Sequence, residues 1–288
     1  MPHLPQIPPE IQKAILSDKN LSILSILKFP FPAVTRSITE PDNQVQNFLL
    51  HLIPTVTSTN KIQAIPTPPL ALLDKLVRSP KLSVSQSVLC SHMRGSSTEQ
   101  LPMWILSYWM QVSQLQPLKK KWLDADESLQ KQEHSKQHTN NTKVMIKQVY
   151  NALACISWAS NIQGFSASIT TDHLATYLTK DWFSDEHKNQ MLYLLQQEVR
   201  RERRDDRIDA CDTFFIKRLV DLHQDADGPE RYATAAAYAW LQAKGQELAT
   251  EVLEMLATIT NIGNNHWVAL VIDFKNSKFC IVIQWGAQ

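Results

Sequence analysis

The most regular hydrophobic pattern of the chain lies near its C-terminal end. Residues 267–272 read Trp-Val-Ala-Leu-Val-Ile, a near-continuous apolar run that is typical of a buried strand. Turn-forming residues occupy positions 273–278, and residues 279–285 would return as an adjacent antiparallel strand. The pattern predicts a terminal hairpin with His266 at the start of its first strand. That position is a rigid platform for a general base, although a histidine at a strand end more often has a structural role.

Helical periodicity dominates the rest of the chain. Trp104, Tyr108 and Val112 recur every four residues and form one apolar face of a helix that Pro117 should end. Ser184 is a good N-cap for a further helix. The face that this helix should bury consists of Met191, Leu194, Leu195 and Val199. Other helices are expected at about residues 8–16, 67–76, 118–130, 144–157, 171–178 and 230–256.

Proline content divides the chain into regions. Twelve prolines lie in residues 1–80, out of 15 in the chain, so residues 1–100 are expected to be a loosely structured, proline-rich region. Residues 131–143 are wholly polar and have the composition of a linker. We therefore expect a helical segment with a polar linker at 101–143 and a C-terminal domain at 144–288.

Composition and charge narrow the classes of function. The 288 residues carry a net charge of +1, which gives no global reason to expect a nucleic-acid or membrane partner. Four cysteines lie without CxxC spacing, which indicates neither a zinc site nor a disulfide framework, and no other metal or cofactor is indicated. The start of the chain resembles no signal peptide and no run is long enough to span a membrane. An intracellular protein of the nucleus or cytoplasm is expected.

Two basic runs allow local alternatives. Lysines 119–121 precede Trp122, but the acidic residues that follow favour a solvated helix face over a nucleic-acid contact. Residues 200–207 contain five arginines among acidic residues, which favours a salt-bridged helix end and leaves a polyanion or acidic-protein contact open.

Three motifs, in order, are similar to those of one enzyme family. They are residues 181–186 (Asp-Trp-Phe-Ser-Asp-Glu), residues 212–215 (Asp-Thr-Phe-Phe) and residues 265–273 (Asn-His-Trp-Val-Ala-Leu-Val-Ile-Asp). From about residue 172 onward the chain resembles the SUMO-specific, or sentrin-type, cysteine proteases, which process ubiquitin-like proteins and remove them from conjugates. The resemblance implies an α+β fold: a papain-like cysteine protease domain, incomplete here, preceded by a mostly helical, proline-rich region.

The resemblance also implies roles for individual residues. His266 corresponds to the general base that takes the proton from a cysteine thiol. Trp182 and Trp267 correspond to two indoles that enclose the Gly-Gly tail of SUMO or another ubiquitin-like protein, because residues without side chains fit between flat rings.

Two departures from the family concern the catalytic partners of His266. The family carries an aspartate on the return strand, where this chain reads Cys-Ile-Val-Ile-Gln at 280–284, and its nucleophilic cysteine lies further downstream with an oxyanion-hole glutamine. Cys280 lies on the return strand, in the wrong chain order to replace that nucleophile. We therefore expect a C-terminally truncated, inactive catalytic domain. The alternatives are a non-catalytic adaptor that binds a ubiquitin-like protein, or a degenerate fragment derived from a mobile element.

A shifted reading frame would explain both departures. Residues 280–286 are compatible with the codons TGT-ATA-GTG-ATT-CAA-TGG-GGG, which read from the third base give Tyr-Ser-Asp-Ser-Met-Gly. That peptide resembles the missing aspartate strand of the family, so a frame shift near Cys280 is a hypothesis for the gene.

Overall fold

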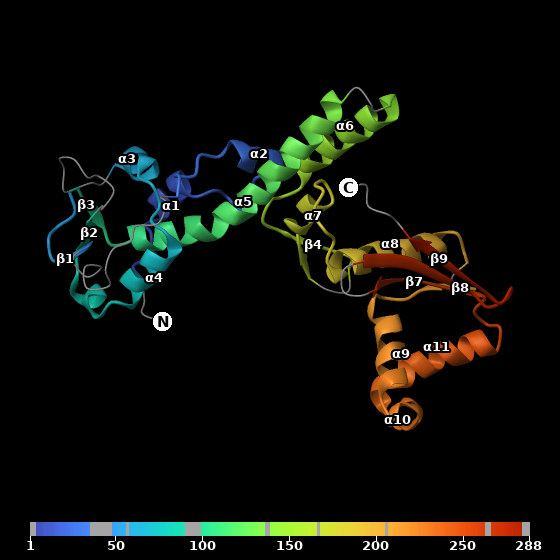
Figure 1. The fold of residues 1–288 in the computed structure, drawn as a ribbon. Coiled ribbons are helices and arrows are strands. Elements are labelled where there is room, and N and C mark those ends of the chain that lie inside the picture. Colours follow the sequence, from blue (N-terminus) through green and yellow to red (C-terminus); the bar gives the residue numbers. More distant parts are fainter. Residues whose placement is uncertain are drawn as a thin grey trace. The chain divides into compact units, whose positions relative to one another are not determined.

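The computed structural model describes residues 4–34, 48–55, 58–89, 99–135, 139–165, 168–204, 207–262 and 266–283 (Figure 1). The chain forms two compact units. Unit 1 comprises Met1–Gln163 and Ser168–Lys180, and unit 2 comprises Gly164–Ala167 and Asp181–Gln288. The boundary expected at residue 143 thus falls inside unit 1, and the main division follows Lys180.

One long helix, α5, organises unit 1. It runs from Ile105 to His134 and contains Pro117, so the prediction that this proline ends the helix is wrong. Tertiary packing is the reason. Before the proline, α5 buries Tyr108, Trp109 and Val112 in one hydrophobic cluster, and after it α5 buries Trp122 in another. These contacts on both sides outweigh the hydrogen bond that proline cannot donate.

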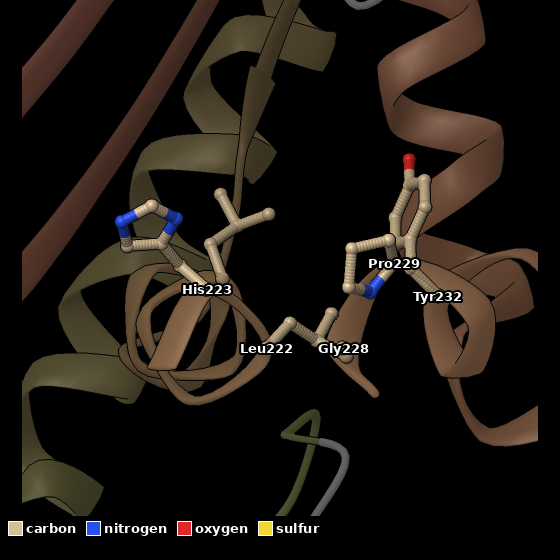
Figure 2. Close-up of a pocket in the computed structure, with 6 residues that line it drawn as sticks. Leu222, His223, Gly228, Pro229 and Tyr232 are labelled. Atoms are coloured by element: carbon tan, nitrogen blue, oxygen red, sulfur yellow. The ribbon is translucent and has the colours of Figure 1, made fainter. Parts of the chain in front are cut away.

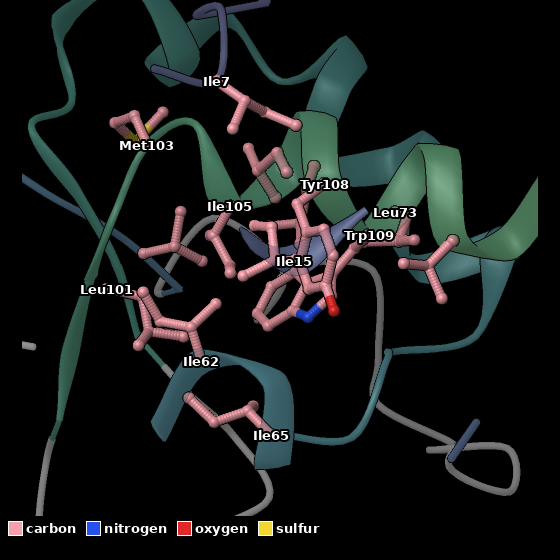
Figure 3. Close-up of a cluster of buried hydrophobic side chains, with 14 of the residues drawn as sticks. Ile7, Ile15, Ile62, Ile65, Leu73, Leu101, Met103, Ile105, Tyr108 and Trp109 are labelled. Carbon is pink, nitrogen blue, oxygen red and sulfur yellow. The ribbon is translucent and has the colours of Figure 1, made fainter. Parts of the chain in front are cut away.

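The first cluster fills the part of unit 1 that precedes α5 and includes its first turns (Figure 3). Around it lie α1 (Pro9–Ile15), α3 (Thr59–Ala64), α4 (Leu70–Arg78), a 3₁₀ helix (Pro80–Val84) and the antiparallel strands β1 (Leu49–Leu50), β2 (Ser87–Leu89) and β3 (Gln100–Pro102). Ile15, Ile62 and Leu101 are fully buried there. The described part of the proline-rich region is therefore packed rather than loose, because its short helices share one core.

The second cluster joins α5 to α2 (Ile23–Lys28), α6 (Asn140–Cys155) and α7 (His173–Thr176), near the short β4 (Asn161–Ile162) and β5 (Ile169–Thr170). The expected linker at 131–143 contains the end of α5 and the start of α6. Helix α6 begins there because the Thr139 hydroxyl caps it by accepting a hydrogen bond from the Thr142 amide at 3.4 Å. Trp122 is 1% exposed, which removes it from any nucleic-acid contact. The adjacent Lys121 pairs with Asp172 at 2.7 Å.

A four-stranded sheet forms the centre of unit 2. Its order is β6 (Ile208–Ala210), β7 (Met255–Ile262), β8 (His266–Asp273) and β9 (Lys278–Ile283), with β6 parallel to β7 and the other pairs antiparallel. The predicted terminal hairpin is confirmed as β8 and β9. Strand β7 was not predicted, because the alanine-rich stretch before it extends the helical pattern to residue 256.

Helices lie on both faces of this sheet. Leu256 and Ile272 point to the face that shares a core with α9 (Phe214–Gln224) and α11 (Ala239–Ala249). Helix α8 (Asp185–Arg201) contacts β6 and β7. The single helix expected at 230–256 is wrong: α10 (Gly228–Thr234) ends where Ala235 adopts an extended backbone, and a 3₁₀ turn (Ala236–Tyr238) leads into α11. The mixture of helices with a mostly antiparallel sheet confirms the α+β class.

The prediction for the buried face of α8 is also wrong. Met191, Leu194 and Leu195 are 43%, 57% and 44% exposed, whereas His187, Lys188, Gln190 and Leu192 are buried. Helix α8 lies against strand β6 and the loop after it, whose amides need acceptors. Gln196 Oε1 accepts from the Ala210 amide at 2.7 Å, and Asn189 Oδ1 accepts from the Thr213 amide at 2.9 Å. Polar side chains therefore occupy the inner face.

Three arginines of the basic run at residues 200–207 pair with acidic residues, and one of these pairs is Arg204 with Glu202 at 3.8 Å. Arg201 pairs with Glu198, and Arg207 pairs with Glu254. Among the described residues, no helix has both the length and the apolar character that crossing a bilayer requires.

Candidate functional site

His266 is the first residue of β8, as predicted, and its backbone pairs with Ile262 of β7. Its side chain is half-buried. Because side chains alternate along a strand, His266 belongs to the same face as Val268 and Ile272, the face covered by α9 and α11. Trp267 belongs to the opposite face. The side chains of His266 and Trp267 therefore lie on opposite faces of the sheet.

Trp267 packs against Lys188, a residue that no sequence pattern indicated. Lys188 Nζ lies 3.9 Å from the centre of the Trp267 ring and 5.9 Å from that of Phe183, and it also donates a hydrogen bond to the Phe183 carbonyl. Only 6% of Lys188 is exposed. Burial lowers the pKa of Lys188, since the charged form loses water, and the carboxylate of Asp185 partly opposes this shift.

His187 and Ser184 lie beside these residues at the start of α8. The rings of Phe183 and His187 stack with their centres 5.8 Å apart, and the Ser184 hydroxyl lies 2.7 Å from His187 Nδ1. Ser184 is the N-cap residue, as predicted, although its side chain contacts His187 instead of a backbone amide. We call Phe183, His187, Lys188 and Trp267 the Trp267 cluster.

Trp182 lies outside the Trp267 cluster. Its side chain is 76% exposed and makes no ring contact with another described residue. It immediately precedes Phe183, whose carbonyl accepts the Lys188 hydrogen bond. The segment that carries Trp182 is thus attached to the cluster, while the indole itself is exposed.

Comparison with known proteins bears on this segment. Residues 181–282 match the model of the Ulp1 protease family, C-terminal catalytic domain. This segment, about a third of the chain, is similar to that catalytic domain. Both His266 and Trp267 lie inside the match, as does the whole of the Trp267 cluster. A search of curated proteins gave no match.

Two solved structures are similar to the chain, both of the SUMO protease Ulp1. One has its catalytic cysteine oxidised to a sulfenic acid; identity is 15% and the TM-score 0.34, over 53% of this chain and 60% of the other. The second has that cysteine oxidised to a sulfinic acid. Its sequence identity to this chain is 20% and the TM-score is 0.35, and the match covers 49% of this chain and 56% of the other. The chain thus spans less than two thirds of either structure.

The strand register separates Cys280 from His266. Cys280 pairs with Val271, five residues along β8 from His266, which is about 16 Å at the usual rise of a strand. The odd separation also puts the two residues on opposite faces of the sheet. The thiol therefore cannot reach the imidazole, which agrees with the sequence argument against Cys280 as nucleophile.

The other cysteines offer no alternative nucleophile within unit 2. Cys211 is buried, and burial together with Asp209 raises the pKa of its thiol to about 12. Cys155 belongs to unit 1, and Cys90 lies outside the described residues. Strand β9, from Lys278 to Ile283, contains no carboxylate that could orient His266. In the part of the chain that the structure describes, no three His, Cys, Asp or Glu side chains gather as metal ligands would.

Unit 2 also contains a cavity of about 270 Å³ between α9 and α10 (Figure 2). Its lining is mainly apolar, with Leu222, Pro229 and Tyr232 around it and His223 at one side. The first residue of α10, Gly228, also borders it. The cavity includes no residue of the Trp267 cluster, so it is a feature of helix packing rather than part of the predicted site.

Proposed function

We propose that unit 2 binds the C-terminal Gly-Gly tail of SUMO or another ubiquitin-like protein. The observation that carries this proposal is the match of residues 181–282 to a protease family, with His266 and Trp267 both inside the matched segment. Proteases of this kind act on modifiers whose last residues are glycines, as the sequence resemblance implies. The intracellular location expected from the sequence accompanies this proposal as a prediction.

The chemistry of the predicted site suits a tail without side chains. The exposed Trp182 indole offers a flat apolar surface next to Phe183, whose carbonyl is joined to Trp267 through Lys188. Glycine residues can approach such a ring closely, and larger side chains would collide with it. Trp182 would then change from an exposed side chain to a covered one on binding, and this burial of an aromatic ring would supply much of the affinity.

We further propose that this chain binds the tail without cleaving it. Cleavage by a cysteine peptidase requires a thiolate within reach of the histidine, so that an acyl-enzyme can form. Cys280 is five residues along the strand and on the other face, and Cys211 holds its proton at neutral pH. His266 would remain as the general base of the ancestral enzyme. A degenerate fragment without any selected activity is the second candidate.

A binding experiment separates these readings. Mature SUMO ending in Gly-Gly is titrated with the full chain by isothermal titration calorimetry, and SUMO shortened by those two glycines serves as the matched control. We expect binding of the complete form only, and its loss in Trp267→Ala. Equal affinity for both forms would overturn the proposed recognition of the tail, and no binding of either form would favour the fragment.

A covalent probe tests for cleavage chemistry. SUMO carrying a C-terminal vinyl sulfone reacts with an activated thiolate in a peptidase site, and we expect no adduct with this chain. An adduct that disappears in Cys280→Ser or in His266→Ala would show that the chain is an active peptidase, contrary to our proposal.

A further inference from the structure

The Lys188 ammonium lies between the segments of unit 2 that carry Trp182 and Trp267. It contacts the face of the Trp267 ring on β8 and bonds to the carbonyl of Phe183, the residue after Trp182. We propose that Lys188 is a positioning residue that fixes the Trp267 indole and joins it to the Trp182 segment through its positive charge. Its consequence for binding rests on the proposed function, whereas its effect on Trp267 does not.

The contacts of Lys188 show why its charge depends on the indole. A buried ammonium loses its hydration and must recover that energy from other partners. Among the described residues, its partners are the Phe183 carbonyl and the two rings, and no carboxylate lies within ion-pair distance. The Trp267 ring, at 3.9 Å, is the nearer of the two, and the electron-rich face of indole is the best aromatic partner for a cation. The cation and the ring therefore hold each other in place.

The position of Lys188 in α8 gives a second argument. It is the fourth residue of the helix, and its amide donates to the Ser184 carbonyl at 3.2 Å. The start of a helix carries a partial positive charge, so a cation is unfavourable there and a carboxylate such as Asp185 is favoured. A buried cation at this end is a local conflict with helix electrostatics. Such conflicts are expected where a site requires them rather than where packing alone decides.

A lysine that merely fills space is the competing explanation, and it predicts different behaviour on substitution. Methionine retains the length and apolar stem of lysine but removes the charge, so a space-filling role would survive Lys188→Met. Arginine retains the charge and stacks on aromatic rings, so a role that depends on the cation would survive Lys188→Arg. Lys217, an exposed lysine of α9, provides the matched control Lys217→Met.

Fluorine NMR of the full chain labelled with 5-fluorotryptophan tests the positioning role without any ligand. The chain has eight tryptophans, and the variants Trp267→Phe and Trp182→Phe assign their two signals. We expect Lys188→Met, and Lys188→Gln as a second uncharged variant, to shift and broaden the Trp267 signal. Lys188→Arg should restore the wild-type signal, and Lys217→Met should leave it unchanged. An unchanged Trp267 signal in both uncharged variants would overturn the proposal, as would a signal that Lys188→Arg fails to restore.

Binding of Gly-Gly SUMO then tests the consequence for recognition. We expect Lys188→Met to weaken binding about tenfold, and Lys188→Arg to bind within about threefold of wild type, since a tenfold change in Kd corresponds to about 1.4 kcal/mol. If wild type itself fails to bind SUMO, the proposed function fails, while the fluorine spectra still decide whether Lys188 positions Trp267. Normal SUMO binding by Lys188→Met would refute the role in recognition.

Discussion

Replacing Gly228 with alanine should disrupt unit 2 by forcing α9 and α10 apart. Gly228 is the buried first residue of α10, which lies against the last turn of α9. A Cβ atom there would lie 2.8 Å from the carbonyl carbon of Leu222 and closer still to its oxygen. Ordinary contacts of a Cβ begin at about 3.4 Å. Because the obstructing atoms belong to the backbone, a side-chain rotation cannot relieve the collision.

The cost follows from what must move. Separating the two helices disturbs Leu222, which is 6% exposed and belongs to the core shared with β7 and β8. Forcing an extra carbon into a packed core costs about 1–3 kcal/mol and sometimes more when the backbone shifts. We expect the upper end, about 3 kcal/mol, for Gly228→Ala. That is a large part of the stability of a typical domain.

Amide hydrogen exchange measures this loss within one unit of a two-unit chain, where a single melting curve would combine both units. Peptides from α9 and β7 should exchange about a hundredfold faster in Gly228→Ala, since each factor of ten corresponds to about 1.4 kcal/mol. Peptides from unit 1 report the background. The control is Gly245→Ala inside α11, where the new Cβ would meet only the Tyr232 hydroxyl, at 3.1 Å, and alanine favours the helix. Exchange in Gly228→Ala within threefold of wild type, or equal effects of both variants, would refute the reasoning.

Three further predictions concern single groups. The Asp172 carboxyl is buried, which raises its pKa, but hydrogen bonds from Lys121 and Thr170 outweigh burial and lower the pKa below 3.8. The stability that Asp172 contributes to unit 1 is therefore complete above its ordinary pKa and is lost as the pH falls through its lower pKa in the folded state. In urea unfolding at pH 7, Asp172→Asn should lower the free energy of unfolding by about 1–2 kcal/mol. An equal loss at pH 2 would contradict this prediction. Cys211 should resist a thiol reagent at pH 8 in the folded chain whereas Cys280 reacts, and rapid labelling of Cys211 would show that it is accessible. If the transcript contains one more nucleotide just before codon 280, it will encode aspartate at position 283. Position 283 pairs with Val268, so this aspartate would be a diagonal neighbour of His266 on the same face of the sheet. Sequencing the transcript tests the hypothesis, and codons incompatible with the shifted frame would remove it.

The sequence predicted the parts of the molecule whose pattern is local. The apolar run at 267–272 identified β8, and the turn residues after it identified the hairpin, so His266 was located correctly at the start of a strand. Local patterns failed where tertiary contacts decide. Helix α5 continues through Pro117 because two cores need it, and β7 was hidden because its threonines follow an alanine-rich stretch.

The site was predictable only in part for the same reason. The interaction of Lys188 with Trp267 joins residues 79 positions apart, and nothing in the local sequence of either residue indicates it. The polar inner face of α8 reverses the usual pattern, since Asn189 and Gln196 satisfy backbone amides of other elements.

The continuity of α5 determines how unit 1 can come apart. The helix is about 45 Å long at 1.5 Å per residue, and it carries residues of both hydrophobic clusters on one hydrogen-bonded rod. The two clusters use successive segments of α5, and Leu115 packs against both, so the loss of one cluster disturbs the other. The weakest point of the rod is the turn that ends at Pro117, where one backbone hydrogen bond is absent. Unit 1 should consequently unfold in one cooperative transition, and a substitution that uncouples the two clusters should act at the turn that ends at Pro117.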